Sequence, residues 1–384
     1  MKKASLFSRL IYLFIPAVFL IISSSLIFAQ EPKMDTNVPF GWCVVPSSVG
    51  EPPLAGQKVV TTTGGHDGRV VRASSRADFG YLCVSEEPLV ILTEGSYGVT
   101  PIGSNKTVVG AGGGASGHFT IKNASNIIIR NFIISGKAGD GITINGGSHV
   151  WIDHCDLSNC GDGLIDIING ADKIVISWCR FSNHVKTMLI NNGSRKPMDW
   201  GRLNVTLTHN FFDSTDQRHP RAGIGMIHIL NCYYRSCGKI TKTGYGIHTY
   251  WQCKTTVERC YFEDTFDAIS HHRTEDGIEP GYCHLIDNHT DSVSKIGLTS
   301  ETEKDKIFQI HEYYMYDFAV IKDAKKVPDI VGKGAGTGTE WSKVGPLPIP
   351  GQGAVNISTK PSLNWTKVGL EVLFKVYFGK TFPP

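Results

Sequence analysis

The sequence lacks any long segment with the helical spacing of apolar residues, and only 19% of its residues are charged. It also lacks a recognisable nucleotide-binding glycine loop, a zinc-ligand spacing and a serine-centred catalytic triad. These absences argue against a helical bundle, a nucleotide-dependent enzyme, a zinc enzyme and a serine hydrolase.

The mature part of the chain is expected to lack net charge. Lys2, Lys3 and Arg9 precede an apolar run that ends in small residues near Ala29, which is the pattern of a secretory signal peptide. An uncleaved membrane anchor is the alternative, because the apolar run is long. Removal of residues 1–29 lowers the number of Lys and Arg residues from 38 to 35, against 35 Asp and Glu residues.

A neutral protein has no global electric field with which to attract nucleic acid or anionic lipid. We therefore expect a secreted protein, extracellular or periplasmic, that acts as a monomer and has no nucleic-acid partner and no membrane partner after cleavage. Any attraction to a polyanion must be local.

Short β-rich segments recur six times, at 127–135, 150–158, 174–182, 206–214, 227–235 and 256–264. Their equivalent positions, which we call anchors, are separated by 21 to 32 residues and are Asn131, His154, Trp178, Asn210, Asn231 and Arg259. Mostly aliphatic residues stand two positions before each anchor. This repeat, with no helix-length pattern between the segments, predicts an all-β fold in which coils stack into a parallel β-helix with inserted loops.

The ten cysteines all follow residue 29, where export permits disulfides. The positions after the anchors form a predicted internal column of rings and thiols: Phe132, Cys155, Cys179, Phe211, Cys232 and Cys260. Buried thiols are the favoured interpretation there, with disulfides as the alternative. Cys160 and Cys237 are the better disulfide candidates, because they fall where coils turn.

We predict four parts of the chain. Residues 1–29 are the signal peptide, 30–58 an N-terminal extension, 59–331 the β-helix catalytic domain, and 332–384 an irregular segment that packs back on the helix. Glycine and proline are frequent at 332–353, which predicts an exposed loop there.

Polar residues recur about eight positions after the anchors and form a predicted ridge on one outer face of the coils. The acidic members are Asp140, Asp162 and Asp166. Carboxylates on adjacent coils repel one another unless a cation lies among them, and their hard oxygen atoms suit calcium. The alternatives are a solvated acidic patch or aspartates that stabilise turns.

The basic members of the ridge are Lys186 and Arg218. Salt bridges to Asp162 or Asp216 are the simple alternative for them. Pro220 stiffens the turn after Arg218, and the glycines at 223 and 225 allow another chain to approach the backbone. A local ridge of cations outside the cell predicts an acidic polysaccharide as ligand.

Eight segments, in order and at fitting intervals, resemble the pectate lyase family over roughly residues 59 to 262. Each motif alone is weakly specific, whereas the ordered set is highly specific. The segments are TTTGGHDGRVV (61–71), PLVILTEG (88–95), SNKTVVGAG (104–112), VWIDHCDLS (150–158), DGLIDI (162–167), HVKTMLI (184–190), NVTLTHNFFD (204–213) and RHPR (218–221).

The resemblance implies a right-handed, single-stranded parallel β-helix that cleaves polygalacturonate by β-elimination with calcium. It implies that Asp140, Asp162 and Asp166 bind the metal. It also implies that Lys186 binds substrate and that Arg218 takes the C5 proton; we expect Lys186 to be catalytic too, because with calcium it would neutralise the substrate carboxylate, and we expect Arg221 and His184 to contact substrate. Three positions depart from the family pattern: Ala138 replaces an aspartate, Gly223 an arginine, and Asn191 a glycine.

Arginine is an unusual base, because the pKa of a guanidinium ordinarily lies above 12. Nearby positive charge favours its neutral form, so we expect an alkaline optimum. The alternatives are a polygalacturonase-like hydrolase, a calcium-independent pectin lyase, or a non-catalytic polysaccharide-binding β-helix. Hydrolysis would leave Lys186 and Arg218 without a chemical role.

Overall fold

The computed structural model describes residues 40–45, 61–111, 114–193, 195–270, 279–294, 296 and 320–338. The predicted signal peptide and the segment 339–384 lie outside these residues. Among the residues described, no helix has the length and apolar character needed to span a membrane.

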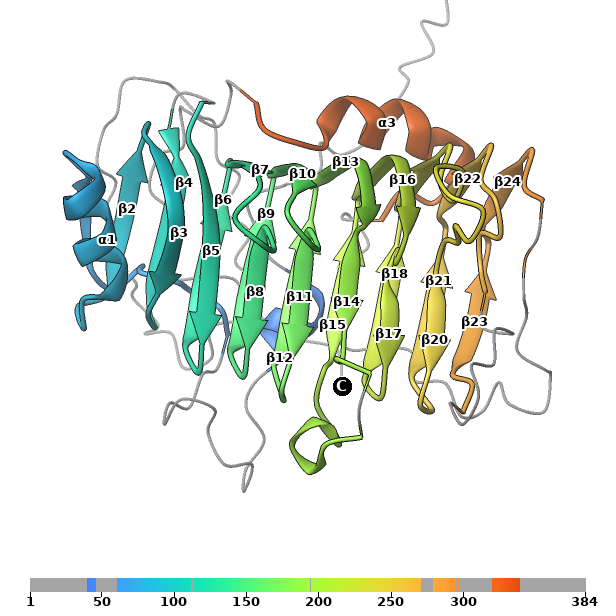
Figure 1. Ribbon diagram of the computed structural model, residues 1–384, viewed down its shortest axis with the longest axis horizontal. Helices are drawn as coiled ribbons and strands as arrows, with labels where there is room; N and C mark the ends of the chain where they lie inside the picture. Colours follow the sequence, from blue (N-terminus) through green and yellow to red (C-terminus); the bar gives the residue numbers. More distant parts are fainter. Residues whose placement is uncertain are drawn as a thin grey trace, which may run out of the picture. The chain divides into compact units, whose positions relative to one another are not determined.

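The described chain coils through two parallel sheets (Figure 1). The first sheet has ten strands, and each newly added strand pairs with the strand one coil earlier. In order, its strands are β1 (Arg69–Arg72), β2 (Leu89–Thr93), β4 (Lys106–Gly110), β6 (Ser125–Arg130), β9 (Ser148–Asp153), β12 (Asp172–Ser177), β15 (Val205–Thr208), β18 (Met226–Leu230), β21 (Lys254–Glu258) and β23 (Tyr282–Ile286).

The second sheet has fourteen strands in two rows that meet at β5 (Ser116–Lys122), which also pairs with β3 (Ser96–Ile102). The upper row continues through β7 (Ile133–Gly136), β10 (Asp156–Cys160), β13 (Arg180–Lys186), β16 (Phe211–Gln217), β19 (Tyr233–Arg235), β22 (Tyr261–Glu263) and β24 (His289–Asp291). The lower row continues through β8 (Ile142–Asn145), β11 (Ile165–Ile168), β14 (Met188–Ile190), β17 (Arg221–Gly223) and β20 (His248–Tyr250).

From β6 to β20, each coil contributes one strand to each of three faces, which confirms the predicted parallel β-helix. The helices within the described residues are short. They are α1 (Arg76–Val84), α3 (Val327–Gly334) and the 3-10 turns η1 (Gly41–Val44), η4 (Pro197–Asp199) and η7 (Ala324–Lys326).

The strand register corrects one predicted anchor. Ile176, Leu207 and Ile229 are register partners, so the fourth anchor is His209 and not Asn210. His209 has a positive φ of 54°, and its ring stacks on that of Trp178 at 4.5 Å. The same left-handed backbone recurs at the other anchors, because each first-sheet strand must turn sharply there into the next face.

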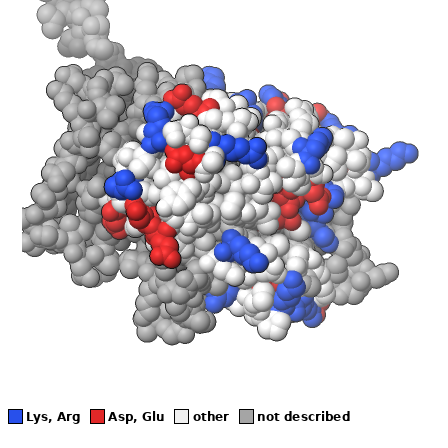
Figure 2. Space-filling view, turned by 60° about the vertical axis from the view of Figure 1, so that its left-hand side comes forward, with Lys and Arg blue, Asp and Glu red and all other residues white. Residues whose placement is uncertain are grey.

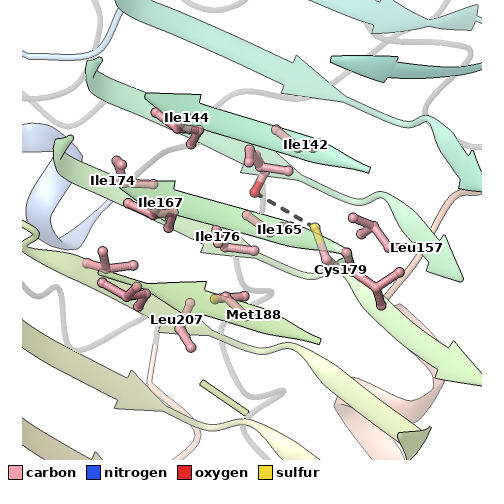
Figure 3. Close-up of a cluster of buried hydrophobic side chains, with 14 of the residues drawn as sticks. Ile142, Ile144, Leu157, Ile165, Ile167, Ile174, Ile176, Cys179, Met188 and Leu207 are labelled. Atoms are coloured by element: carbon pink, nitrogen blue, oxygen red, sulfur yellow. Dashed lines mark hydrogen bonds between the residues drawn. The ribbon is translucent and has the colours of Figure 1, made fainter. Parts of the chain in front are cut away.

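The interior is filled by aliphatic side chains from all three faces, as Figure 3 shows for Ile176 of the first sheet, Leu157 of the upper row and Ile167 of the lower row. A second internal stack is aromatic, with neighbouring ring centroids 4.6 to 4.8 Å apart, and consists of Phe181, Phe212, Tyr234 and Phe262. These stacked side chains hold successive coils in one register.

All ten cysteines lie within the described residues and are buried free thiols. The predicted column exists, but Asn210 replaces Phe211 in it because of the shifted anchor. The Sγ atom of Cys179 accepts the backbone N–H of Cys155, and Cys260 does the same for Cys232. The disulfides considered for Cys160 and Cys237 are not formed in this structure, where both side chains pack in the core as thiols.

The segment predicted as an exposed loop from residue 332 begins inside α3, which lies against the coils (Figure 1). Residues 335–338 are also attached to the coils. The Gly336 N–H donates to the Trp178 carbonyl at 2.7 Å, and the Thr337 N–H donates to Asp156 Oδ2 at 3.0 Å. The prediction failed there because glycine-rich sequence also suits backbone that runs closely over a packed surface.

Charged side chains of both signs are interspersed on the face in Figure 2, with no large field of one sign. The visible surface thus agrees with the balanced composition, and any preference for a polyanion must come from a few placed groups.

Candidate active site

The predicted polar residues lie where the chain passes from the upper row to the lower row of the second sheet. Asp140 precedes β8, Asp162 precedes β11, Lys186 ends β13, and Arg218 precedes β17. Backbone hydrogen bonds join these turns: Gly161 N–H to the Gly139 carbonyl at 2.9 Å, Leu164 N–H to the Lys186 carbonyl at 3.1 Å, and Met188 N–H to the Arg218 carbonyl at 2.8 Å. Four successive coils therefore bring these residues to one edge.

The carboxylates of Asp140 and Asp166 face a common small space at Gly163. A Cβ atom on Gly163 would lie 3.0 Å from Asp166 Oδ1 and 3.1 Å from Asp140 Oδ1. The Gly163 N–H donates to Asp140 Oδ1 at 2.7 Å, and Thr143 Oγ1 lies 3.3 Å from Asp140 Oδ2. A larger side chain at 163 would fill the space that the two oxygens share.

The electrostatics of this space favour a cation. Burial, and then the negative charge of Asp140, raise the pKa of the Asp166 carboxyl to about 7. The positive charge of Arg218 opposes this rise, and that of Lys186 does so more weakly. Two carboxylates that bind a proton this readily are destabilised when both are charged, and a hard cation such as calcium would relieve that destabilisation.

Asp162 points to Lys186 instead, with 2.7 Å between Oδ1 and Nζ. This hydrogen bond holds the pKa of the Asp162 carboxyl below its usual range. Within the described ranges, no three His, Cys, Asp or Glu side chains are grouped closely enough to hold a metal ion. The three-carboxylate arrangement implied by the resemblance is thus present as a pair, with the third member bonded to Lys186.

Arg218 lies on the next coil with a left-handed backbone, at φ 68°. Its Nε is buried and has no hydrogen-bond partner within the part of the chain that the structure describes. Asp216, which we considered as a partner for Arg218, accepts hydrogen bonds from the Ile240 and Thr241 backbone instead, at 2.7 and 3.0 Å.

The residue after Arg218 anchors the turn. The ring of His219 is fully buried and contacts Thr215 Oγ1 at 2.7 Å and the Tyr245 carbonyl at 3.0 Å. Burial lowers the pKa of His219 to about 4, so the ring is neutral at neutral pH. The His219–Pro220 bond is cis.

The two expected substrate contacts differ in position. Arg221 lies on the outer face of β17 with its guanidinium carbon 4.8 Å from the centre of the Tyr250 ring. His184 Nε2 lies 2.5 Å from the Asp162 carbonyl oxygen, so its ring supports the turn that carries Asp162.

Sequence reasoning missed three residues around this edge. Gly163 separates the carboxylates, Tyr250 lies beneath Arg221, and His118 contacts the Asp140 and Ser135 carbonyls, each at 2.9 Å. Gly163 was readable as the glycine of the DGLID segment. Tyr250 and His118 gave no signal, because their role depends on neighbours one or two coils away.

Comparisons with known proteins find relatives by sequence and by fold. A family model described as pectate lyase matches residues 91–276. The pectate trisaccharide-lyase of Thermotoga sp. (strain RQ2) is 29% identical over 339 residues, which cover 77% of this chain and 91% of that protein. Pectate lyase B of Colletotrichum gloeosporioides is 34% identical over 226 residues, covering 54% of this chain and 67% of that protein.

A solved structure has the same fold. The pectate lyase of Bacillus sp. N165, crystallised in complex with trigalacturonate, superposes with a TM-score of 0.63 at 22% identity. The superposition covers 79% of this chain and 99% of that one.

Proposed function

Because this chain belongs to the pectate lyase family and is a polysaccharide lyase, we propose that it cleaves polygalacturonate by calcium-assisted β-elimination, with Arg218 as the base. One observation carries the proposal. The carboxylates of Asp140 and Asp166 face the same space at Gly163, on coils next to those that carry Lys186 and Arg218. With the acids holding a cation, the lysine and the guanidinium suit a substrate that carries a carboxylate on each repeating sugar.

In this reaction the C5 proton goes to the base, the C4–O bond breaks, and a C4=C5 double bond forms in the new terminal sugar, while the departing oxygen takes the bonding electron pair and a proton from solvent and becomes the hydroxyl of a new reducing end. Negative charge develops on C5 and spreads into the C6 carboxylate. Fixed positive charge at that carboxylate lowers the barrier, which is the largest contribution expected from this site.

Asp140 and Asp166 are the residues proposed to hold calcium, and the rise in the Asp166 pKa supports the fit. When bound, calcium supplies positive charge that neutralises the substrate carboxylate. Asp162 would join them by giving up its bond to Lys186, which frees the lysine for a substrate carboxylate. Both side chains are exposed enough to rearrange, at 44% for Lys186 and 61% for Asp162.

Arg218 is proposed to accept the C5 proton. Its buried Nε lacks a hydrogen-bond partner among the described residues, so this nitrogen is not bonded to a structural carboxylate there. The turn behind it is held by the buried ring of His219, which fixes where the guanidinium can reach.

We also propose that residues 1–29 are removed on export and that residues 59–331 form the catalytic domain, because the coils that carry the site lie within that range.

The test is incubation of the purified exported chain with polygalacturonate, with calcium or with a chelator. A lyase forms an unsaturated, ultraviolet-absorbing product, and its rate falls with chelator. New reducing ends without that absorbance would indicate a hydrolase. Binding without either product would indicate a carbohydrate-binding β-helix, and full activity on methylated pectin in chelator would indicate a pectin lyase. Any of these three results would contradict the proposal.

A further inference from the structure

The outer face of the lower row carries two columns of side chains beside the candidate active site. In the first column, Asp166, Leu189 and Arg221 are successive register partners. The second column lies two residues further along each strand. In it, Gly223 and Tyr250 are register partners. Asn191 directly follows the register partner of Ala222 and therefore lies beside Gly223.

The side chain of Tyr250 extends from β20 across β17 and is hydrogen-bonded at the end of β14. Its ring lies directly on Gly223, because a Cβ atom there would be 2.7 Å from the ring carbon Cε2. Its hydroxyl donates to the Asn191 carbonyl at 3.0 Å. The side chain is fully buried, and burial raises the pKa of its hydroxyl, so the group stays a proton donor.

The guanidinium of Arg221 lies over this ring, with its carbon 4.8 Å from the ring centre. A planar cation over an aromatic face is attracted to it, and the attraction restricts where the cation can go. Four residues therefore contact one another across β14, β17 and β20, and we call them the unit: Asn191, Gly223, Tyr250 and Arg221. Its member Arg221 follows Arg218 by three residues in the sequence.

We propose that Tyr250 is a positioning residue for Arg221, and that the unit holds Arg221 to bind the carboxylate of a uronate next to the one attacked by Arg218. The binding role rests on the proposed function, whereas the Tyr250–Arg221 contact does not. Tyr250 itself touches no reacting atom. Its effect is on substrate affinity and not on the chemical step.

The first test separates KM from kcat on polygalacturonate. We expect Tyr250→Phe, which loses the bond to Asn191, to raise KM about threefold, and Tyr250→Leu, which also loses the ring, to raise it about tenfold. Gly223→Ala, which displaces the ring, should raise KM in the same way. In all three variants kcat should stay within about twofold of wild type.

Tyr233→Phe is the matched control, because its hydroxyl bonds Glu263 on the upper row, away from Arg221. It should leave KM unchanged. Tyr250→Phe keeps the shape of the buried ring, so its melting temperature should match that of the control variant.

A second test needs no substrate. The Nε–Hε resonance of Arg221, assigned with Arg221→Lys, should shift in Tyr250→Leu as the guanidinium loses the ring over which it lies. A wild-type protein that forms no unsaturated product would refute the proposed function, while the resonance would still decide the contact. An active enzyme whose Tyr250 variants keep the wild-type KM, or lose kcat at unchanged KM, would overturn the inference.

Discussion

At the scale of single residues, the missing side chain of Gly163 leaves the space that the carboxylates of Asp140 and Asp166 both face. The Oδ1 atoms of Asp140 and Asp166 both lie within about 3 Å of the place where its side chain would begin. Proximity and burial then explain why Asp166 holds a proton near neutral pH, while the more exposed Asp162, bonded to Lys186, does not. Asp162 and Asp166, with the same intrinsic chemistry, thus differ in charge because of their surroundings.

Replacement of Arg218 tests the base. We expect Arg218→Lys and Arg218→Gln to lower kcat by a factor of about 100 or more, because proton transfer loses its acceptor, while KM changes little. The measurement is the initial rate of unsaturated product formation. Arg72→Lys, on exposed β1, is the control and should keep full activity. Near-normal activity of Arg218→Lys would rule out an essential role for this guanidinium.

Asp166 makes stability depend on pH. Its pKa rises from an ordinary value near 3.8 to about 7, so between these values the folded chain holds a proton that the unfolded chain has lost. Stability therefore falls as pH rises through this window. In chelator, we expect the free energy of unfolding to fall by an amount on the order of 2 kcal/mol between about pH 5 and about pH 8, beyond the change seen in Asp166→Asn.

Urea denaturation at a series of pH values measures this difference. Calcium should remove most of the fall, because the cation replaces the proton between the carboxylates. Asp162→Asn serves as a control that should leave the slope between about pH 5 and about pH 8 unchanged, since the lowered pKa of Asp162 contributes stability that is lost only as pH falls below about 3.8. Parallel pH curves for wild type and Asp166→Asn would contradict the burial of charge described here.

At the scale of elements, the sequence predicted the coils well because each strand repeats the same apolar pattern. It misplaced one anchor, where His209 and Asn210 stand side by side and the asparagine matched Asn131 and Asn231 by type. The residue with the left-handed backbone is His209, and the backbone conformation of one polar residue cannot be read from its type alone. An insertion between β14 and β15 hid the one-residue shift.

Two departures from the family pattern also become related only in the structure. Gly223 and Asn191 both contact the hydroxyl-bearing end of Tyr250, so a glycine in place of arginine makes room for the ring, and the side-chain Oδ1 of an asparagine in place of glycine lies 3.2 Å from the hydroxyl. The sequence presents them as separate losses. Their connection depends on a tyrosine that lies 27 residues beyond Gly223.

The loop after β19 depends on one buried carboxylate. Asp216 accepts the N–H groups of Ile240 and Thr241 and the Thr241 hydroxyl. We expect Asp216→Ala to destabilise the protein by about 2–4 kcal/mol, because these donors lose their acceptor inside the fold. Asp213→Ala removes a surface pair with Arg235 and should cost about 1 kcal/mol or less. Equal effects of the two variants in urea denaturation would refute the distinction.

At the scale of the whole molecule, the ten cysteines add to the core without cross-linking it. Burial raises the pKa of Cys160 to about 11 and of Cys237 to about 12, so neither forms the reactive thiolate at neutral pH. We expect a thiol reagent to label none of the ten in the native protein and all ten after unfolding. A reductant should leave the melting temperature unchanged. A melting temperature lowered by reductant would show that a disulfide forms.

The lengths of the turns differ widely while the register of the strands does not. The connection from β11 to β12 takes three residues, 169–171, and that from β14 to β15 takes fourteen, 191–204, yet Ile174 and Val205 still pair directly. A chain built this way can exchange or extend its lateral loops, and so change the surface beside the candidate site, while the separation between Arg218 and the pair Asp140 and Asp166 stays fixed by the rise from one strand to the next.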